Sequence, residues 1–258
     1  GCEYGDFAIL YRTNAQSRAF EEQMRKTAIP YRIYSGLSFY QRKEIKDAIA
    51  YMRLVVNPND EEALKRVVNY PARGIGNTTM GKIQMAATKA GVSLWEVICN
   101  PSFYNTSIGT ATTSKLGAFR SLVTCFKDKA EGEDAFTLTR SLLAESGMMK
   151  DIYEGKDAED VARQENIDEF LNSIMMFVDT RREEQDSPSV SVADFLQEVA
   201  LLTDLESDDG EQSKVSLMTV HAAKGLEFST VFIVGMEENI FPSQMSSDSP
   251  RALEEERR

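Results

Sequence analysis

The chain has 258 residues, of which 42% are hydrophobic, so it is long enough for one large domain or two ordinary ones. No apolar run approaches the roughly 20 residues of a membrane-spanning helix, and no signal peptide is visible. Three scattered cysteines, Cys2, Cys99 and Cys125, lack the spacing of a metal site and predict reduced thiols in a cytoplasmic protein.

The net charge of −12 argues at first sight against binding to nucleic acid. The charge is unevenly distributed, however. Residues 1–90 contain 14 Lys+Arg and 9 Asp+Glu, a net charge of +5, whereas the rest of the chain contains 15 and 32, a net charge of −17. A basic surface that contacts phosphates is therefore compatible with this composition.

Apolar runs at the two ends of the chain predict three short buried strands of a parallel sheet, and residues 31–34 are predicted to form a further strand. Between the first two strands, residues 15–27 have the pattern of an amphipathic helix, with Phe20 and Met24 on one face. This strand–helix–strand order is typical of a parallel sheet. The expected strands are residues 7–11, 31–34, 215–220 and 231–234.

The stretch between these ends is predicted to be helical. Residues 105–114 are expected to form a loop, and the acidic residues 206–212 a connection back to the sheet. Two methionine pairs, 148–149 and 175–176, are expected to fill the core. The expected helices are residues 43–56, 61–69, 79–90, 93–99, 115–130, 135–147, 158–182 and 191–203. The predicted fold class is α/β, with a partial parallel-sheet domain split by a large all-helical insertion.

Residues 215–242, VSLMTVHAAKGLEFSTVFIVGMEENIFP, contain the strongest functional signal. The polar connection between the two strands holds the only histidine, His221, followed by Lys224, Gly225 and Glu227. Loops at the carboxyl ends of strands carry the ligand-binding groups of open α/β sheets. By spacing alone, H-x-x-K-G-x-E is more typical of a solvated turn between core strands.

Residues 10–18, LYRTNAQSR, follow the first strand. Arg12 and Arg18 are fork-shaped donors suited to phosphate, and Asn14 and Gln16 can bond to sugar or phosphate oxygens. The alternative is an ordinary strand-to-helix turn with surface cations.

Residues 69–82, NYPARGIGNTTMGK, predict a helix–hairpin–helix-like element. Two glycines let the backbone approach a phosphate, and the free N–H groups of the following helix point at it. We expect a valine at Gly76 to block this approach and to be incompatible with the turn. The alternative is a tight turn without a ligand. The candidate contacts are Arg73, Gly74, Gly76, Thr78 and Lys82.

The string TVHAAKGLEF, residues 219–228, closely resembles motif V of superfamily 1 DNA helicases of the UvrD/PcrA/Rep type. Residues 10–18 resemble motif IVa, and the ending LEEERR also resembles this family. The resemblance is strong at residues 6–83 and 214–258. It implies a partial RecA-like domain 2A at residues 1–35 and 213–258, interrupted by a helical domain 2B at residues 36–212 with the helix–hairpin–helix-like element near residues 60–90.

The segment SGLSFYQRKEIKD, residues 35–47, resembles the passage into domain 2B, where Gly36 suits a hinge. The family often has a basic residue at the position of Ser38, so a phosphate contact by Ser38 is not expected here.

The resemblance implies an ATP-dependent helicase of 3′-to-5′ polarity, with ATP and Mg²⁺ as cofactors and single-stranded and duplex DNA as partners. DNA repair, replication restart and a plasmid role all stay open as the process it serves. In this family, residues matching Lys224, Gly225 and Glu227 face the nucleotide. The expected single-strand contacts are Arg12, Asn14, Thr219 and His221, and the expected duplex contacts are Arg73, Gly74, Gly76, Thr78 and Lys82.

Some catalytic motifs of such a motor are missing from this sequence. It contains no G-x-x-x-x-G-K-[ST] and no Walker B-like strand end. We therefore expect an N-terminal motor domain elsewhere in the parent chain, a final arginine motif beyond residue 258, no complete catalytic set here, and no ATPase activity of these residues alone. Two alternatives stay open: a non-catalytic module that docks duplex DNA or protein, and a subunit of a helicase–nuclease.

Overall fold

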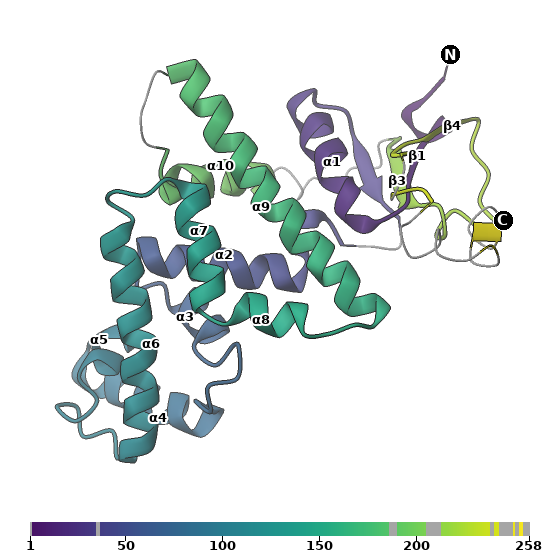
Figure 1. Cartoon of the computed structure of the whole chain (residues 1–258). Helices are drawn as coiled ribbons and strands as arrows, with labels where there is room; N and C mark the ends of the chain where they lie inside the picture. The colour runs from purple at the N-terminus through teal and green to yellow at the C-terminus, as the bar shows by residue number, and fades with distance from the viewer. Residues whose placement is uncertain are drawn as a thin grey trace. The chain divides into compact units, whose positions relative to one another are not determined.

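The computed structural model describes residues 2–34, 37–185, 190–204, 213–237, 240–242, 250 and 253–254. The chain divides into two compact units, which we call the sheet unit, Gly1–Arg42 with Leu202–Arg258, and the helical unit, Lys43–Leu201 (Figure 1). Three features of the sequence lie outside the described residues: the hinge candidate Gly36, the acidic stretch 206–212 and most of the ending LEEERR. The domain limits expected from the sequence stay a prediction.

The sheet unit contains a four-stranded parallel sheet in the order β2-β3-β1-β4. Its two central strands come from opposite ends of the chain, and Ala8 pairs with Ser216 while Tyr11 pairs with Thr219. The expected α/β fold class is confirmed. The strands are β1 Phe7–Tyr11, β2 Tyr31–Ile33, β3 Val215–Thr219 and β4 Thr230–Ile233; the helical segments of this unit are η1 Tyr4–Asp6, η2 Asn14–Gln16, α1 Ser17–Lys26 and η3 Phe39–Gln41.

A different segment covers each face of the central strands β1 and β3. On one face, Tyr11, Val215 and Leu217 pack against Met24 and Phe20 of α1. On the other face, Ala8, Leu10 and Met218 pack against apolar residues of the loop that follows β3, Val220, Ala222, Ala223, Leu226 and Phe228. The loop with the motif V resemblance is therefore one of the two covers of the sheet. The edge strand β4 is largely exposed, with Val231, Phe232 and Ile233 at 44%, 51% and 50%, so the expectation that it is buried was wrong.

The helical unit is built around α2, Lys43–Val56, which lies against α3, α6, α7 and α9. Apolar residues surround this helix, as expected for a buried one. Asp47 is also buried, and its carboxylate accepts hydrogen bonds from Arg66 Nε at 2.7 Å and Lys43 Nζ at 3.1 Å. The remaining helices are α3 Glu61–Val67, α4 Asn77–Ala90, α5 Leu94–Cys99, α6 Thr110–Lys129, α7 Ala135–Glu145, α8 Met148–Tyr153, α9 Ala158–Gln185 and α10 Val192–Asp204.

Three expectations about this unit were wrong. Residues 110–114 are the first turn of α6 rather than loop, because the carbonyl of Gly109 accepts from the amides of Thr112 and Thr113. The short helix α8 was not predicted. Of the methionine pairs, Met148 is fully buried, but Met175 and Met176 are 40% and 57% exposed, so the second pair does not fill the core. Within the described residues, no helix combines the length and apolar character needed to cross a membrane.

Candidate nucleic-acid interface

The pairing of β1 with β3 brings together the residues expected to contact single-stranded DNA. Tyr11 and Thr219 are register partners, and the Val220 amide donates to the Tyr11 carbonyl at 2.9 Å. The segments that follow, with Arg12 and Asn14 on one side and His221 on the other, therefore leave the same edge of the sheet. This is the carboxyl edge, where parallel sheets place their ligand groups.

The turn after β1 is shaped by Gln16. Its side-chain oxygen accepts from the backbone amides of Arg12 at 2.9 Å and Thr13 at 3.0 Å. Its amide nitrogen lies against Gly235, where a Cβ would overlap it. The contacts of Gln16 thus connect the turn after β1 to the end of β4. From the sequence, Gln16 was instead considered as a contact for sugar or phosphate oxygens of DNA. Asn14, in contrast, has an exposed side chain.

The loop after β3 alternates between apolar anchors and exposed polar groups. Leu226 and Phe228 pack on the sheet, whereas His221, Lys224 and Glu227 are exposed. The Thr219 hydroxyl accepts from the Ala222 amide at 3.2 Å and holds the start of the loop. Gly225 has φ +86°, a conformation that strains other residues. The string HAAKGLEF therefore fixes the loop by its apolar members and presents its polar members to solvent.

The Gly-Ile-Gly turn is held by hydrogen bonds within a few residues. The Asn69 side-chain oxygen accepts from the amides of Arg73 at 3.0 Å and Ile75 at 2.9 Å, and Ile75 is 1% exposed. Gly74 has φ +72°, so the turn requires glycine there. Gly76 has φ −80° and ψ 175°, which any residue adopts, and nothing lies within 4 Å of a Cβ at this position. The expectation that a valine at Gly76 is incompatible with the turn is wrong.

Helix α4 begins directly after this turn, with Gly76 at its N-cap position. Among the described residues, the amides of Asn77 and Thr78 have no hydrogen-bond acceptor. Thr78 and Lys82 are exposed, and Lys82 Nζ donates to the Ser107 carbonyl at 2.7 Å. Free amides and the helix dipole make this end of α4 electropositive.

Arg73 is bound within the protein. Its half-buried guanidinium makes five hydrogen bonds and stacks over the Phe119 ring at 5.3 Å. These contacts occupy the group that the sequence analysis assigned to duplex DNA. The acceptors are the carbonyl oxygens of Val67, Tyr70, Pro71 and Ser146 and the hydroxyl of Tyr51.

One residue that the sequence analysis missed lies at the turn. A Cβ at Gly74 would be 2.5 Å from Lys115 Nζ, so the ammonium group from α6 lies directly against this glycine. Lys115 is distant in sequence, and no local pattern connects it with the turn.

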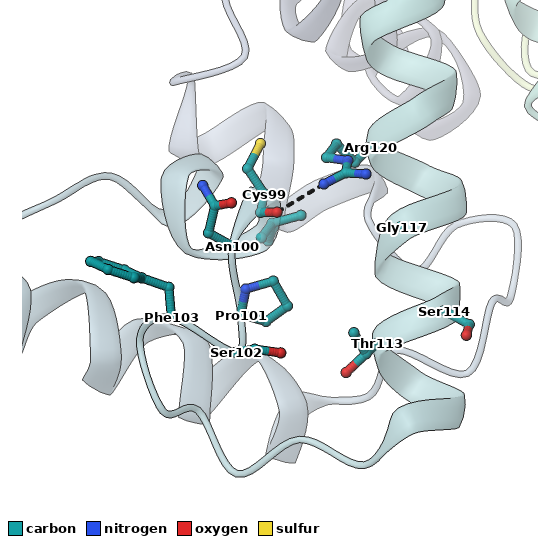
Figure 2. A pocket seen from close by; sticks show the side chains of 10 residues that line it. Cys99, Asn100, Pro101, Ser102, Phe103, Thr113, Ser114, Gly117 and Arg120 are labelled. Carbon is teal, nitrogen blue, oxygen red and sulfur yellow. Dashed lines mark hydrogen bonds between the residues drawn. The ribbon is translucent and has the colours of Figure 1, made fainter.

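A cavity of about 380 Å³ lies in the helical unit between the end of α5 and the first half of α6 (Figure 2). Arg120 donates to the Cys99 carbonyl at 2.8 Å, and burial raises the pKa of the Cys99 thiol. None of the residues expected to bind DNA or nucleotide lines this cavity. Across the described part of the chain, no three His, Cys, Asp or Glu side chains are grouped as metal ligands.

A parallel sheet whose strands come from both ends of the chain, on either side of a long helical region, defines a protein of the α/β class. The chain belongs to the UvrD-like helicase C-terminal domain family, which matches residues 1–258, and the resemblance inferred from the sequence is confirmed.

Individual relatives support the same assignment. The chain is 40% identical over 255 residues to the ATP-dependent DNA helicase PcrA of Leuconostoc citreum, covering 99% of this chain and 34% of the relative. It is 38% identical over 258 residues to DNA helicase II of Escherichia coli, covering 100% and 35%. It is also 39% identical to PcrA of Bacillus subtilis, covering 98% and 34%. The chain thus spans about a third of the length of these relatives.

Proposed function

We propose that this chain is the C-terminal part of an ATP-dependent DNA helicase that moves 3′-to-5′ along a single strand and unwinds duplex DNA in the cytoplasm. The observation that supports the proposal best is the parallel pairing of β1 with β3. This pairing joins the two segments that resemble motifs IVa and V at one edge of the sheet. DNA repair is the process in which we place the protein.

In this proposal the carboxyl edge of the sheet serves two ligands. Arg12, Asn14, Thr219 and His221 contact the single strand, chiefly its backbone, because guanidinium, amide and hydroxyl groups suit phosphate and sugar oxygens. Lys224, Gly225 and Glu227 contact ATP: the ammonium group approaches phosphate, and the carboxylate accepts hydrogen bonds from ribose hydroxyls. Because Thr219 and His221 lie at the start of the loop that carries Lys224, Gly225 and Glu227, a nucleotide-dependent shift of this loop changes the contacts with the single strand.

The described residues fit only part of an ATP site. Lys224 and Glu227 are exposed polar groups on a well-anchored loop, but the part of the chain that the structure describes contains no acidic cluster for Mg²⁺. The sequence also lacks the phosphate-binding loop. We therefore assign the Mg²⁺ ligands and most phosphate contacts to an N-terminal motor domain of the same parent chain. When bound, Mg²⁺ neutralises charge on the transferred phosphoryl group.

Duplex DNA is assigned to the helical unit. Gly74, Gly76, Thr78 and Lys82 bring free amides, a hydroxyl group and an ammonium group to one turn, and all four are exposed. Contacts of this kind go to phosphate and carry no base information. The guanidinium of Arg73 already donates its hydrogen bonds within the protein, so we assign it a structural role at the turn rather than a contact with phosphate.

The test of the motor function uses the longer protein that the proposal requires. Glu227→Ala is expected to raise the KM for ATP about tenfold, since a hydrogen bond to a charged group contributes about 1.5–3 kcal/mol. His221→Ala is expected to lower the stimulation of ATP hydrolysis by single-stranded DNA, with little change in ATP affinity. Asp128→Ala, which removes an exposed acid from α6, is the control for charge.

Two outcomes count against this function. If both substitutions change ATP affinity equally and leave DNA binding intact, the two roles of the loop are wrong. If residues 1–258 alone hydrolyse ATP in a DNA-stimulated and Glu227-dependent manner, the assignment of the phosphate site to another domain is wrong.

A second function, duplex docking without catalysis, is favoured by one observation. The Gly-Ile-Gly turn and its supporting contacts lie entirely within the helical unit, so duplex binding does not depend on the motor. A parent protein that binds duplex DNA but lacks ATP hydrolysis distinguishes this function from the helicase.

A further inference from the structure

Lys115 of α6 has an unusual position for a surface lysine. Its Nζ lies 2.5 Å from the position of a Cβ at Gly74, so the side chain reaches back onto the turn. Across the described residues it makes no hydrogen bond and no ion pair. The ammonium group is therefore unpaired although it lies against the protein.

Its neighbours make this position electrostatically unfavourable without an anion. The first amides of α4 point their positive ends outward beside the turn, and Lys82 adds a second ammonium group. Like charges repel one another. The hydrogen bond of Lys82 goes to a carbonyl, which leaves its charge uncompensated.

The surrounding sequence offers almost no counter-charge. Residues 63–127, which include the turn, α4 and most of α6, contain eight Lys+Arg and one acidic residue, Glu96. The carboxylate of Glu96 accepts hydrogen bonds from Asn100 and Tyr104. In a chain with a net charge of −12, this segment is strongly basic, as expected for a surface that meets a polyanion.

We propose that Lys115 is a duplex-contacting residue of this protein, and that its ammonium group binds the DNA phosphate that the Gly-Ile-Gly turn and the start of α4 also contact. This inference rests on the proposed duplex function of the helical unit. It extends the binding element from one continuous segment, residues 69–82, to a second helix. Lys115 takes the place of the cation that Arg73 does not supply.

The experiment is a fluorescence-anisotropy titration of a labelled hairpin duplex with the 258-residue chain at several salt concentrations. Lys115→Gln is compared with Lys127→Gln, which removes the same charge from the same helix about 18 Å further along. Lys127 is also exposed. Circular dichroism and thermal unfolding verify that both variants keep the parent fold.

Lys115→Gln is expected to weaken binding roughly three- to tenfold at low salt, and to make the slope of log K against log salt shallower by about 0.9, the change for one phosphate contact. Lys127→Gln is expected to change neither quantity measurably. Equal losses in the two variants overturn the proposal, because net charge then explains the effect.

Failure of the inference and failure of the proposed function give different results. If the parent binds the duplex and Gly76→Val weakens binding as expected, but Lys115→Gln binds like the parent, the turn holds DNA and Lys115 does not contact it. If the parent chain does not bind the duplex even at low salt, the proposed duplex function is wrong, and the assignment of Lys115 is wrong with it.

Discussion

At the carboxyl edge of the sheet, Arg12 and Thr219 come together from opposite ends of the chain, through the pairing of β1 with β3. At the Gly-Ile-Gly turn, by contrast, Asn69 organises residues only four and six positions further on. The first region depends on strand register, and the second on local hydrogen bonds. A change in strand register moves every side chain at the edge of the sheet. The turn, in contrast, is disrupted only by changes to its own few hydrogen bonds.

Because the two regions lie in different units, we expect substitutions in one unit to change its stability without changing that of the other. In the helical unit the only tryptophan, Trp95 of α5, reports unfolding by its fluorescence. In the sheet unit, hydrogen exchange of the strand amides reports opening.

Arg73→Met is expected to have the largest effect, a loss of about 2–4 kcal/mol in the unfolding free energy of the helical unit, because several half-buried acceptors lose a charged donor together. The measurement is urea unfolding followed by Trp95 fluorescence. Arg120→Met, which removes a single hydrogen bond to Cys99, is the control and is expected to cost about 1 kcal/mol or less. A stable Arg73→Met variant with weaker duplex binding would instead place Arg73 on the DNA.

Glu21→Ala is the corresponding change in the sheet unit. The buried carboxylate accepts from the Phe39 amide at 3.2 Å and the Ser17 hydroxyl at 2.6 Å, so its removal is expected to cost about 2–3 kcal/mol. Faster hydrogen exchange of the sheet amides, with an unchanged Trp95 transition, is the expected observation. Equal effects on both probes would contradict the independence of the two units.

Glu21 also predicts a pH dependence. Burial raises its pKa above the ordinary value of 4.5, against the opposing effects of Ser17, Phe39 and Arg25. The folded chain therefore keeps this proton to a higher pH than the unfolded chain, and the stabilising contribution is lost as the pH rises from about 4.5 through the folded pKa. Compared with Glu21→Gln, the parent is expected to lose stability across that window. A constant difference between the two proteins contradicts the raised pKa.

Gly74→Val is expected to destabilise the helical unit by about 1–3 kcal/mol, because φ +72° strains a β-branched residue. Lys115 contributes less to this cost, since the far end of a flexible side chain can move away. Urea unfolding followed by Trp95 fluorescence measures the effect. Stability equal to that of the parent would contradict the observed conformation of the turn.

Thr219→Val is expected to cost about 1 kcal/mol in the sheet unit, the usual effect of losing a hydroxyl group that caps a turn. The shape of the side chain is kept, so the register of β3 with β1 is not disturbed. Hydrogen exchange at Ala222 should increase, while exchange at Ile9 and Leu217 in the paired strands stays close to that of the parent. Faster exchange throughout the sheet would show that the hydroxyl group also supports the register.

Much of the fold could be predicted from the sequence. Three strands were predictable because each is a short, mostly apolar run, and β2, with Arg32 at its centre, was predictable from the strand–helix–strand order. Most helices were predictable because caps and spacing agree. The start of α6 was missed because its first turn is rich in threonine, which is typical of loops as well. Within the candidate site, the internal contacts of Arg73 and the position of Lys115 against Gly74 were not predictable, since both depend on contacts with residues distant in sequence.

Gly76→Val is expected to have the smallest effect on stability and the clearest effect on binding. The position has an ordinary extended φ and open space for a side chain, so the unfolding free energy should change by no more than about 0.5 kcal/mol. We nevertheless expect a branched side chain at the N-cap position to obstruct the approach of a phosphate to the free amides of α4. Duplex affinity, which for two or three phosphate contacts is around 10⁻⁴ M near physiological salt, should fall about tenfold.

The control is Gly91→Val at the other end of α4, where φ is +68° and a Cβ also meets open space. Valine there is expected to reduce stability through backbone strain and to leave duplex affinity unchanged once the fraction of folded protein is taken into account. The two substitutions therefore separate backbone strain from access to the helix start. If folded Gly76→Val binds the hairpin duplex as tightly as the parent, the phosphate does not approach the α4 amides, and the turn has only a structural role.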